Sequence, residues 1–215
     1  MTKRGRPPDY ANHVFINCPF DQNYEPIFDA LIFAVFDSGF VVRSALEIDD
    51  SSQARLEKIF AIIDQCKFAI HDLSRTELDP ATHLPRFNMP LELGIFLGAK
   101  RYGRGHNAEK NCLILDTERF RYQRFISDIS GQDIKAHTNS VAEAVACVRD
   151  WLNHVSELKT IPGPEAILRR YDRYKRQLPE ICQALQLRPH EMTFKDKAAF
   201  SAKWLREDAA QRENN

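Results

Sequence analysis

The 215-residue chain lacks the sequence motifs of several large enzyme classes. It has no Gly-x-Gly-x-x-Gly and no Gly-x-x-x-x-Gly-Lys-Ser/Thr, so the phosphate-binding loops of dinucleotide oxidoreductases and P-loop NTPases are missing. The seven histidines are scattered without a His-Glu-x-x-His pair, and no Gly-x-Ser-x-Gly nucleophile elbow occurs. We therefore expect no metal site and no bound cofactor.

The chain also lacks long apolar runs, closely spaced cysteines and a charge excess. No run approaches the roughly 18 apolar residues that span a bilayer, and the basic N-terminus has no apolar segment of the signal-peptide kind. The five cysteines contain no Cys-x-x-Cys, which argues against a zinc site or a disulfide framework. The 30 basic and 30 acidic residues balance, so net charge favours neither nucleic acid nor membrane. These features predict a cytoplasmic protein without membrane contact.

What the chain does contain is a regular alternation of strand-like and helix-like segments. Short runs rich in β-branched and aromatic residues predict strands over 14–18, 40–45, 66–71, 111–116 and 133–137. Apolar residues at helical spacing predict helices over 26–38, 52–65, 90–101 and 141–152, with Ser51 or Ser52 and Ser140 as N-caps. This alternation predicts an α/β fold, a doubly wound parallel five-stranded sheet with helices on both faces.

Composition divides the chain into three parts. Residues 160–164 hold two prolines and a glycine and form the expected linker. Beyond it, Pro179 and Pro189 are expected to interrupt the amphipathic helices. The expected parts are a flexible basic arm (1–12), the α/β domain (13–158) and a helical C-terminal appendage (165–215).

The basic arm allows two interpretations. Arg4 and Arg6 flank a glycine and precede a proline, an arrangement that resembles the AT-hook, a reader of A·T-rich DNA. A solvated basic tail explains the same residues without any DNA. DNA contact through this arm is therefore one alternative.

Polar and turn-forming side chains follow each expected strand. The carboxyl ends of parallel strands meet at one edge, where ligands bind in open α/β sheets, so we expect these side chains to line a common site. The alternative is that they are ordinary polar loop residues. The candidates are Asn17, Pro19 and Phe20 after the first strand, Arg43 after the second, Asp72 and Ser74 after the third, and Arg86 and Asn88 before the next helix.

Glu92 is the most informative of the acidic residues. Pro90 suits a first helical position, Asn88 suits a cap, and Glu92 then falls in the first turn, where the helix dipole favours a carboxylate. The apolar residues at 93–99 predict that this helix is buried. A carboxylate in such a place can stabilise or attack the oxocarbenium ion that forms when an N-glycosidic bond breaks, with Asp72 as a second carboxylate. Alternatively, Glu92 only caps its own helix.

Three short motifs carry a resemblance to a known superfamily. They are Val14-Phe-Ile-Asn-Cys-Pro-Phe-Asp21, Cys66-Lys-Phe-Ala-Ile-His-Asp-Leu-Ser74 and Asn88-Met-Pro-Leu-Glu-Leu-Gly94. Over residues 14–152 the chain resembles the flavodoxin-like superfamily of nucleoside 2-deoxyribosyltransferases and TIR domains, and especially bacterial TIR-like proteins with an Arg-Phe-Asn-Met-Pro-x-Glu-Leu-Gly signature. The resemblance implies that Glu92 matches the transferase nucleophile and the glutamate with which TIR enzymes cleave NAD between nicotinamide and ribose. It also implies a homo-oligomer.

The expected function is hydrolysis or transfer at an N-glycosidic bond of NAD or a related nucleotide, in bacterial antiphage defence or signalling. One alternative is a non-catalytic nucleotide sensor of the same fold that signals to the helical region, and another is an adaptor anchored to DNA by the arm. In the enzyme hypothesis the catalytic carboxylates are Glu92 and Asp72, ribose is held by Asp72, Ser74 and Asn88, the base stacks on Phe20, and phosphate meets Arg43 or Arg86.

Overall fold

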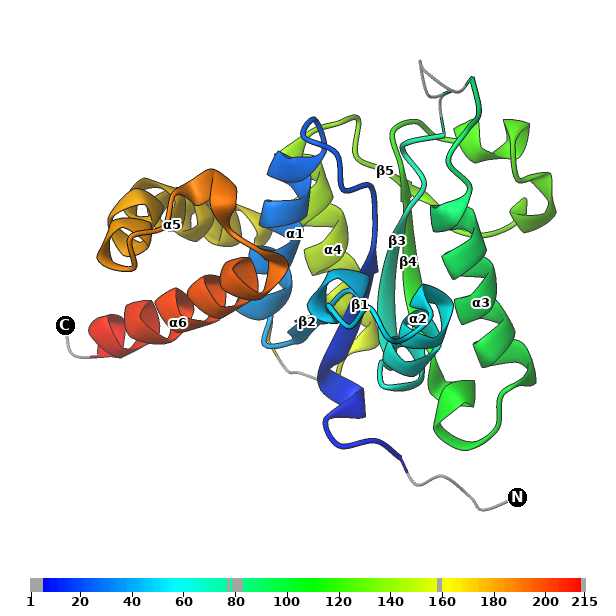
Figure 1. The fold of residues 1–215 in the computed structure, drawn as a ribbon, viewed down its shortest axis with the longest axis horizontal. Helices are drawn as coiled ribbons and strands as arrows, with labels where there is room; N and C mark the ends of the chain where they lie inside the picture. Colours follow the sequence, from blue (N-terminus) through cyan, green and yellow to red (C-terminus); the bar gives the residue numbers. More distant parts are fainter. Residues whose placement is uncertain (1–5, 77, 79–82, 158–159, 214–215) are drawn as a thin grey trace.

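The computed structural model describes residues 6–76, 78, 83–157 and 160–213. Its centre is an all-parallel sheet of five strands (Figure 1). In spatial order they are β2 (Val41–Arg43), β1 (His13–Asn17), β3 (Phe68–Asp72), β4 (Asn111–Asp116) and β5 (Lys135–Ala136). This order confirms the expected flavodoxin-like, doubly wound architecture, in which strand order reverses between β1 and β3.

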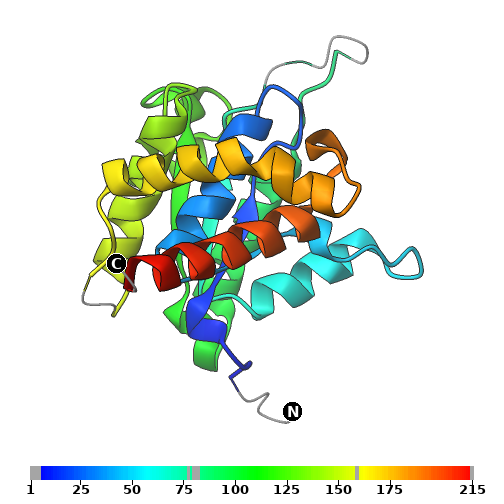
Figure 2. The ribbon, with the colours of Figure 1, turned by 90° about the vertical axis from the view of Figure 1, so that its left-hand side faces the viewer.

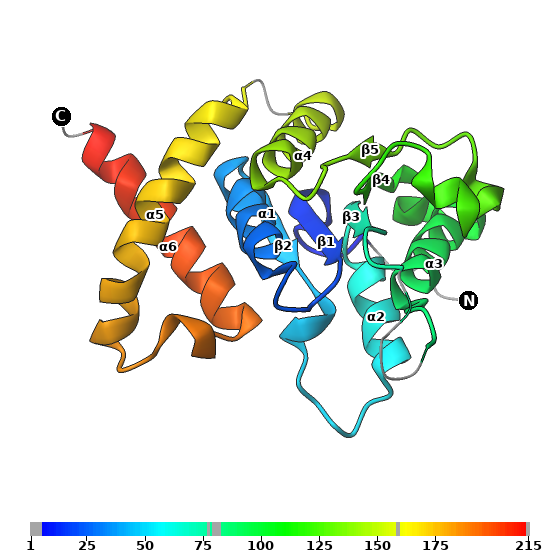
Figure 3. The same cartoon turned by 90° about the horizontal axis from the view of Figure 1, so that it is seen from above.

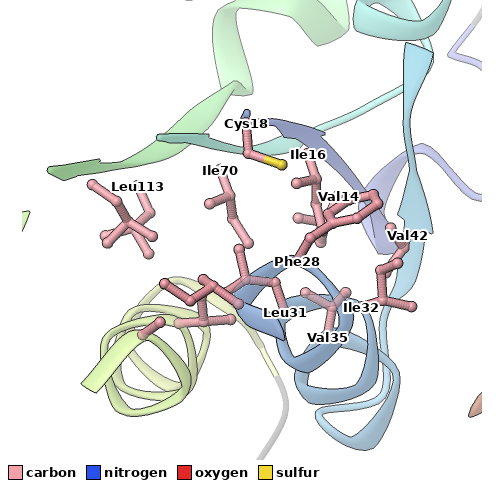
Figure 4. Close-up of a cluster of buried hydrophobic side chains, with 14 of the residues drawn as sticks. Val14, Ile16, Cys18, Phe28, Leu31, Ile32, Val35, Val42, Ile70 and Leu113 are labelled. Atoms are coloured by element: carbon pink, nitrogen blue, oxygen red, sulfur yellow. The ribbon is translucent and has the colours of Figure 1, made fainter. Parts of the chain in front are cut away.

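Helices cover both faces of the sheet because the central strands are apolar on both sides. Ile16 and Ile70 lie in one core with Leu31 (Figure 4), whereas the alternate residues Phe15 and Ala69 lie in a second core on the opposite face. The two-residue period of a strand thus separates the two cores. The first face is covered by α1 (Glu25–Asp37) and α4 (Val141–Val155), and the second by α2 (Arg55–Asp64) and α3 (Asn88–Tyr102).

The two C-terminal helices, α5 (Pro164–Ala184) and α6 (Phe194–Glu213), form a further layer outside α1 and α4 (Figures 2 and 3). The ring of Phe33 in α1 lies 5.4 Å from that of Tyr171 and 5.8 Å from that of Trp204, between centroids. The helical region and the α/β domain therefore share an aromatic core. None of the described helices is both long and apolar enough to cross a membrane.

A buried lysine also joins α6 to α1. Lys197 Nζ lies 2.6 Å from Glu25 Oε1 and 2.7 Å from Asp29 Oδ1. Replacing Lys197 by Met should lower the free energy of unfolding by about 1–2 kcal/mol, because two neighbouring carboxylates lose their cation. Urea unfolding measures the change, and Lys195→Met, an exposed site on the same helix, should shift it by less than about 0.5 kcal/mol. Equal midpoints for the two variants would contradict the expectation.

Of the predicted serine caps, one is confirmed and one is wrong. Ser140 caps α4 through its side chain. Neither Ser51 nor Ser52 caps α2, whose N-cap is Ala54 without a side-chain hydrogen bond. Ser52 instead donates its backbone N–H and its hydroxyl to the Asp50 carboxylate, at 2.9 and 2.6 Å. Such local side-chain bonds compete with helix capping.

The two C-terminal prolines behave differently from each other. Pro179 lies inside α5, which continues to Ala184, so the predicted interruption there is wrong. Pro189 does separate the helices, because it opens the 3-10 turn Pro189–Glu191 between α5 and α6. Packing of α5 on α1, α4 and α6 offsets the hydrogen bond that Pro179 cannot donate.

The fifth strand is shorter than predicted. β5 consists of Lys135 and Ala136, which pair only with Leu115 and Asp116. The chain before it is held in a turn and not in the sheet, and His137 lies just past the strand end. The early part of β4 is therefore left uncovered on its outer side by the described residues.

The basic arm enters the described structure at Arg6. Its guanidinium lies 3.5 Å from Glu109 and over the ring of Tyr10, 5.3 Å from the centroid. Arg4 lies outside the described residues. Contact of this arm with DNA stays a prediction.

Candidate functional site

The reversal of strand order marks a candidate site between the carboxyl ends of β1 and β3, which lie side by side (Figure 3). Asn17 ends β1 and is in register with His71, one residue before the end of β3 at Asp72. Asn17, His71 and Asp72 are all almost completely buried. Three polar side chains thus meet at the place where this fold class binds ligands.

Asp72 is the centre of a buried polar cluster. Its Oδ2 accepts the hydroxyl of Tyr24 at 2.5 Å and lies 3.0 Å from His137 Nε2, while its Oδ1 accepts the backbone N–H of Ser74 at 2.8 Å. Burial favours the neutral acid, but His137, Ser74 and Tyr24 together outweigh it and lower the pKa of Asp72. The carboxylate is therefore ionised and held by three partners.

His137 is fixed in one tautomer. Its Nδ1 accepts the backbone N–H of Asn139 at 3.1 Å, so the ring proton of the neutral imidazole is on Nε2, the nitrogen that faces Asp72. The turn that makes this contact uses left-handed backbone at Thr138 and Asn139, with φ of 47° and 57°. His137 therefore presents an N–H to the carboxylate.

Glu92 differs from Asp72 in having no partner. It is 6% exposed, and its carboxyl group forms no hydrogen bond or ion pair in the described structure. Burial raises the pKa of Glu92 to about 7, and the charge of Arg55 opposes this shift. A carboxyl group with such a pKa can exchange a proton near neutral pH, and perturbed groups of this kind concentrate at functional sites.

The helix that carries Glu92 begins earlier than predicted. α3 starts at Asn88, so Pro90 is its third residue and Glu92 lies in the second turn, not the first. Phe87 is the N-cap, and Asn88 is not the capping residue. The prediction that Glu92 sits against the helix dipole in the first turn is therefore wrong, and the alternative that it caps its own helix loses its basis.

Asn17 ties this helix to the sheet. Its side-chain N–H groups donate to the carbonyl of Met89, in the first turn of α3, and to His71 Nδ1, both at 2.9 Å. His71 is neutral because burial lowers its pKa to about 3. Asn17 therefore fixes the start of α3, and with it Glu92, against β1 and β3.

The thiol of Cys18 is affected by the charges of three acidic side chains at this edge. Its pKa is raised well above the ordinary value, first by burial and then by the charges of Asp72, Glu92 and Asp21. A thiolate here would face several carboxylates in a low-dielectric setting. Asp72 and Glu92 therefore both act on the same buried thiol.

The other predicted site residues lie at this edge with different exposure. Pro19 and Ser74 are buried, and the hydroxyl of Ser74 has no hydrogen-bond partner within the described chain. Phe20 is 42% exposed and packs edge-on against Phe28. Arg86 and Asn88 are exposed, in the loop before α3 and at its first residue.

Arg43 does not join this group. Its guanidinium donates to Glu47 at 2.9–3.0 Å and to Gln65 Oε1 at 3.1 Å, and it lies 3.3 Å from His13 Nδ1. His13 begins β1 and Gln65 precedes β3. Arg43 therefore points toward the amino edge of the sheet, where it stabilises local structure.

Tyr24 and His137 were missed by sequence reasoning. Asp72 was found by looking for polar residues at the end of each predicted strand. His137 was missed because the predicted fifth strand, 133–137, included it, whereas β5 ends at Ala136. Tyr24 gave no comparable signal, because its contact with Asp72 spans 48 positions in the chain.

The described residues line cavities at several other places. Five cavities of about 140–610 Å³ lie along α5, between α1, α5 and α6, around β5, beside β4 and α4, and at the amino edge. None of these five is lined by Asp72 or Glu92. Among the described side chains, no three of His, Cys, Asp or Glu are placed to hold a metal ion.

No protein-family model, no curated protein and no solved structure matches this chain.

Proposed function

We propose that the chain is an N-glycosidic-bond hydrolase or transferase that acts on NAD or a related nucleotide, with Glu92 as its catalytic carboxylate, in bacterial defence or signalling. The observation that carries the proposal is Glu92 itself, a buried and unpartnered carboxyl group with a pKa of about 7 beside the switch point of the sheet. The motif resemblance at residues 86–94 supports the same role.

The proposed chemistry needs only side chains of this chain and water. The bond between C1′ of the ribose and the nicotinamide nitrogen breaks, and its electron pair leaves with nicotinamide. The ionised Glu92 stabilises the oxocarbenium ion or attacks C1′, and water then supplies the oxygen and releases a proton. Asp72 accepts the backbone N–H of Ser74, and the buried Ser74 hydroxyl, which has no partner within the described chain, would bond to a ribose hydroxyl.

Purified protein incubated with NAD should release nicotinamide and ADP-ribose in equal amounts, measured by liquid chromatography. Because Glu92 acts when ionised and its pKa is about 7, kcat/KM should rise several-fold between about pH 6 and pH 8 and then level off. The assay is run over a range of protein concentrations, since the resemblance implies an assembled enzyme. A rate that is zero at every concentration, or flat with pH, would contradict the proposal.

A nucleotide sensor of the same fold is the second candidate. α1 connects the two regions that such a sensor would couple. Tyr24, its N-cap, bonds to Asp72, while Glu25 and Asp29 of its first turns bond to Lys197 of α6. Calorimetric titration with NAD and ADP-ribose separates the candidates, because binding without nicotinamide release supports the sensor. Loss of that binding on Arg86→Glu would place the nucleotide at this edge.

A further inference from the structure

The outer edge of β4 is left unpaired along its first half by the described residues. The N–H of Asn111 donates to the carbonyl of Lys67 at 3.0 Å, and the carbonyl of Leu115 also bonds toward β3. Alternate residues of a parallel strand direct their N–H and C=O groups to opposite neighbours. Cys112 and Ile114 therefore present their backbone groups to the side away from β3.

β5 covers only the end of this edge. Its two residues pair with Leu115 and Asp116, and no described segment pairs with the backbone N–H and C=O of Cys112 or with the N–H of Ile114. Cys112 is only partly buried whereas Ile114 is 3% exposed, so the backbone groups of Cys112 are the ones within reach of an incoming chain. An unpaired strand edge of this kind is a template for another strand.

The open edge lies along a groove of about 610 Å³ between β4 and α4. The indole N–H of Trp151 donates to Asn111 Oδ1 at 3.0 Å, which fixes an aromatic ring beside the edge. The walls combine apolar and charged side chains. From α4 they include Ala146, Cys147, Asp150, Trp151 and Val155, and from the chain around β5 Asp133 and Lys135.

We propose that this groove binds an extended peptide segment of a partner protein, which adds to the sheet beside β4. The unpaired N–H and C=O of Cys112 require a partner with the same alternation of backbone groups, which an extended peptide supplies. Trp151 and Val155 offer an apolar wall for its alternate side chains.

Amide hydrogen exchange followed by NMR tests the contact without any substitution. The probe is a synthetic peptide chosen from a phage-displayed library of random peptides for binding to the full-length protein, with counter-selection against Ala146→Arg. In the free protein the amide of Cys112 should exchange faster than that of Leu113, which is bonded to β3. Saturating peptide should slow exchange at Cys112 about tenfold or more and leave Leu113 unchanged. A bound peptide that leaves Cys112 exchange unaltered would overturn the proposal.

Two variants of α4 provide the matched comparison. Ala146→Arg places a long side chain in the groove and should weaken peptide binding at least about tenfold, whereas Ala142→Arg, one turn earlier and exposed outside the groove, should not. Thermal unfolding verifies that both variants fold. Failure of the library to yield a peptide that distinguishes these variants would count against the groove. A wild-type dimer that Ala146→Arg alone dissociates would assign the groove to a second copy and also overturn the proposal.

Discussion

Glu92→Gln should reduce nicotinamide release from NAD at least about 10³-fold, with little change in KM. The amide keeps the size of the side chain but can neither carry the negative charge that stabilises an oxocarbenium ion nor attack C1′. Chromatography of the products at pH 8 measures the loss. Glu57→Gln, at an exposed position on α2, is the matched control and should retain full activity. Equal activity of wild type and Glu92→Gln would remove Glu92 from the reaction.

The same substitution should make the protein more stable at high pH. In the folded protein the pKa of Glu92 is raised to about 7 from the ordinary value of 4.5. Between these two pH values the unfolded chain releases a proton that the folded chain retains. The wild-type protein therefore loses stability as the pH rises through this interval. Gln avoids this loss. The variant should gain about 2 kcal/mol in unfolding free energy at pH 8 and almost nothing at pH 4.

This stability measurement separates chemistry from folding. An inactive variant that is more stable than wild type at pH 8 cannot owe its inactivity to unfolding. A decrease in stability at pH 8 would show that Glu92 has a stabilising partner, contrary to its isolation in the structure. Loss of function with a gain in stability is the expected signature of a residue retained for activity.

Local sequence signals predicted the parts of the fold that depend on local physics. The apolar run at 111–116 gave the bounds of β4, since a buried parallel strand needs a continuous apolar stretch. Ser140 was recognisable as a cap because its partner is three residues away. The start of α3 was misplaced by two residues, because Pro90 is acceptable at several positions in a first turn.

The candidate site was only partly predictable because its contacts are long-range. The direction of the strands alone was enough to place Asp72 and Asn17 at one edge of the sheet. It did not reveal the hydrogen bond from Asn17 to the carbonyl of Met89, which positions α3. The isolation of Glu92 was not predictable either, because it depends on which side chains fail to reach it. Arg43 was wrongly included in the predicted site. Its position at the end of a strand was read correctly, but its side chain turns away and bonds to Gln65.

Asp72→Ala should destabilise the protein more than any other single change considered, by about 3–5 kcal/mol. The truncation leaves the Tyr24 hydroxyl and the Ser74 backbone N–H without their buried acceptor, and it removes the carboxylate that lies 3.0 Å from His137 Nε2. Urea unfolding at pH 7 measures the loss. Asp128→Ala, at an exposed position, is the control and should change stability by less than about 0.5 kcal/mol.

Asp72→Asn tests whether charge or shape holds the cluster. The amide of Asn has one oxygen and one NH2 group, and the NH2 is a donor. In one orientation the NH2 faces the N–H of Ser74, and in the other it faces the N–H of His137, whose tautomer is fixed by Asn139. Each orientation therefore sets two donors against each other. We expect the free energy of unfolding to fall by about 2–3 kcal/mol at pH 7.

The folded pKa of Asp72 is depressed below 3.8. The stability that the ionised Asp72 contributes is therefore fully present above that value and is lost as the pH falls through the folded pKa. The difference between wild type and Asp72→Asn should therefore shrink below about pH 4, and a difference that stays constant with pH would show that the carboxylate charge contributes nothing.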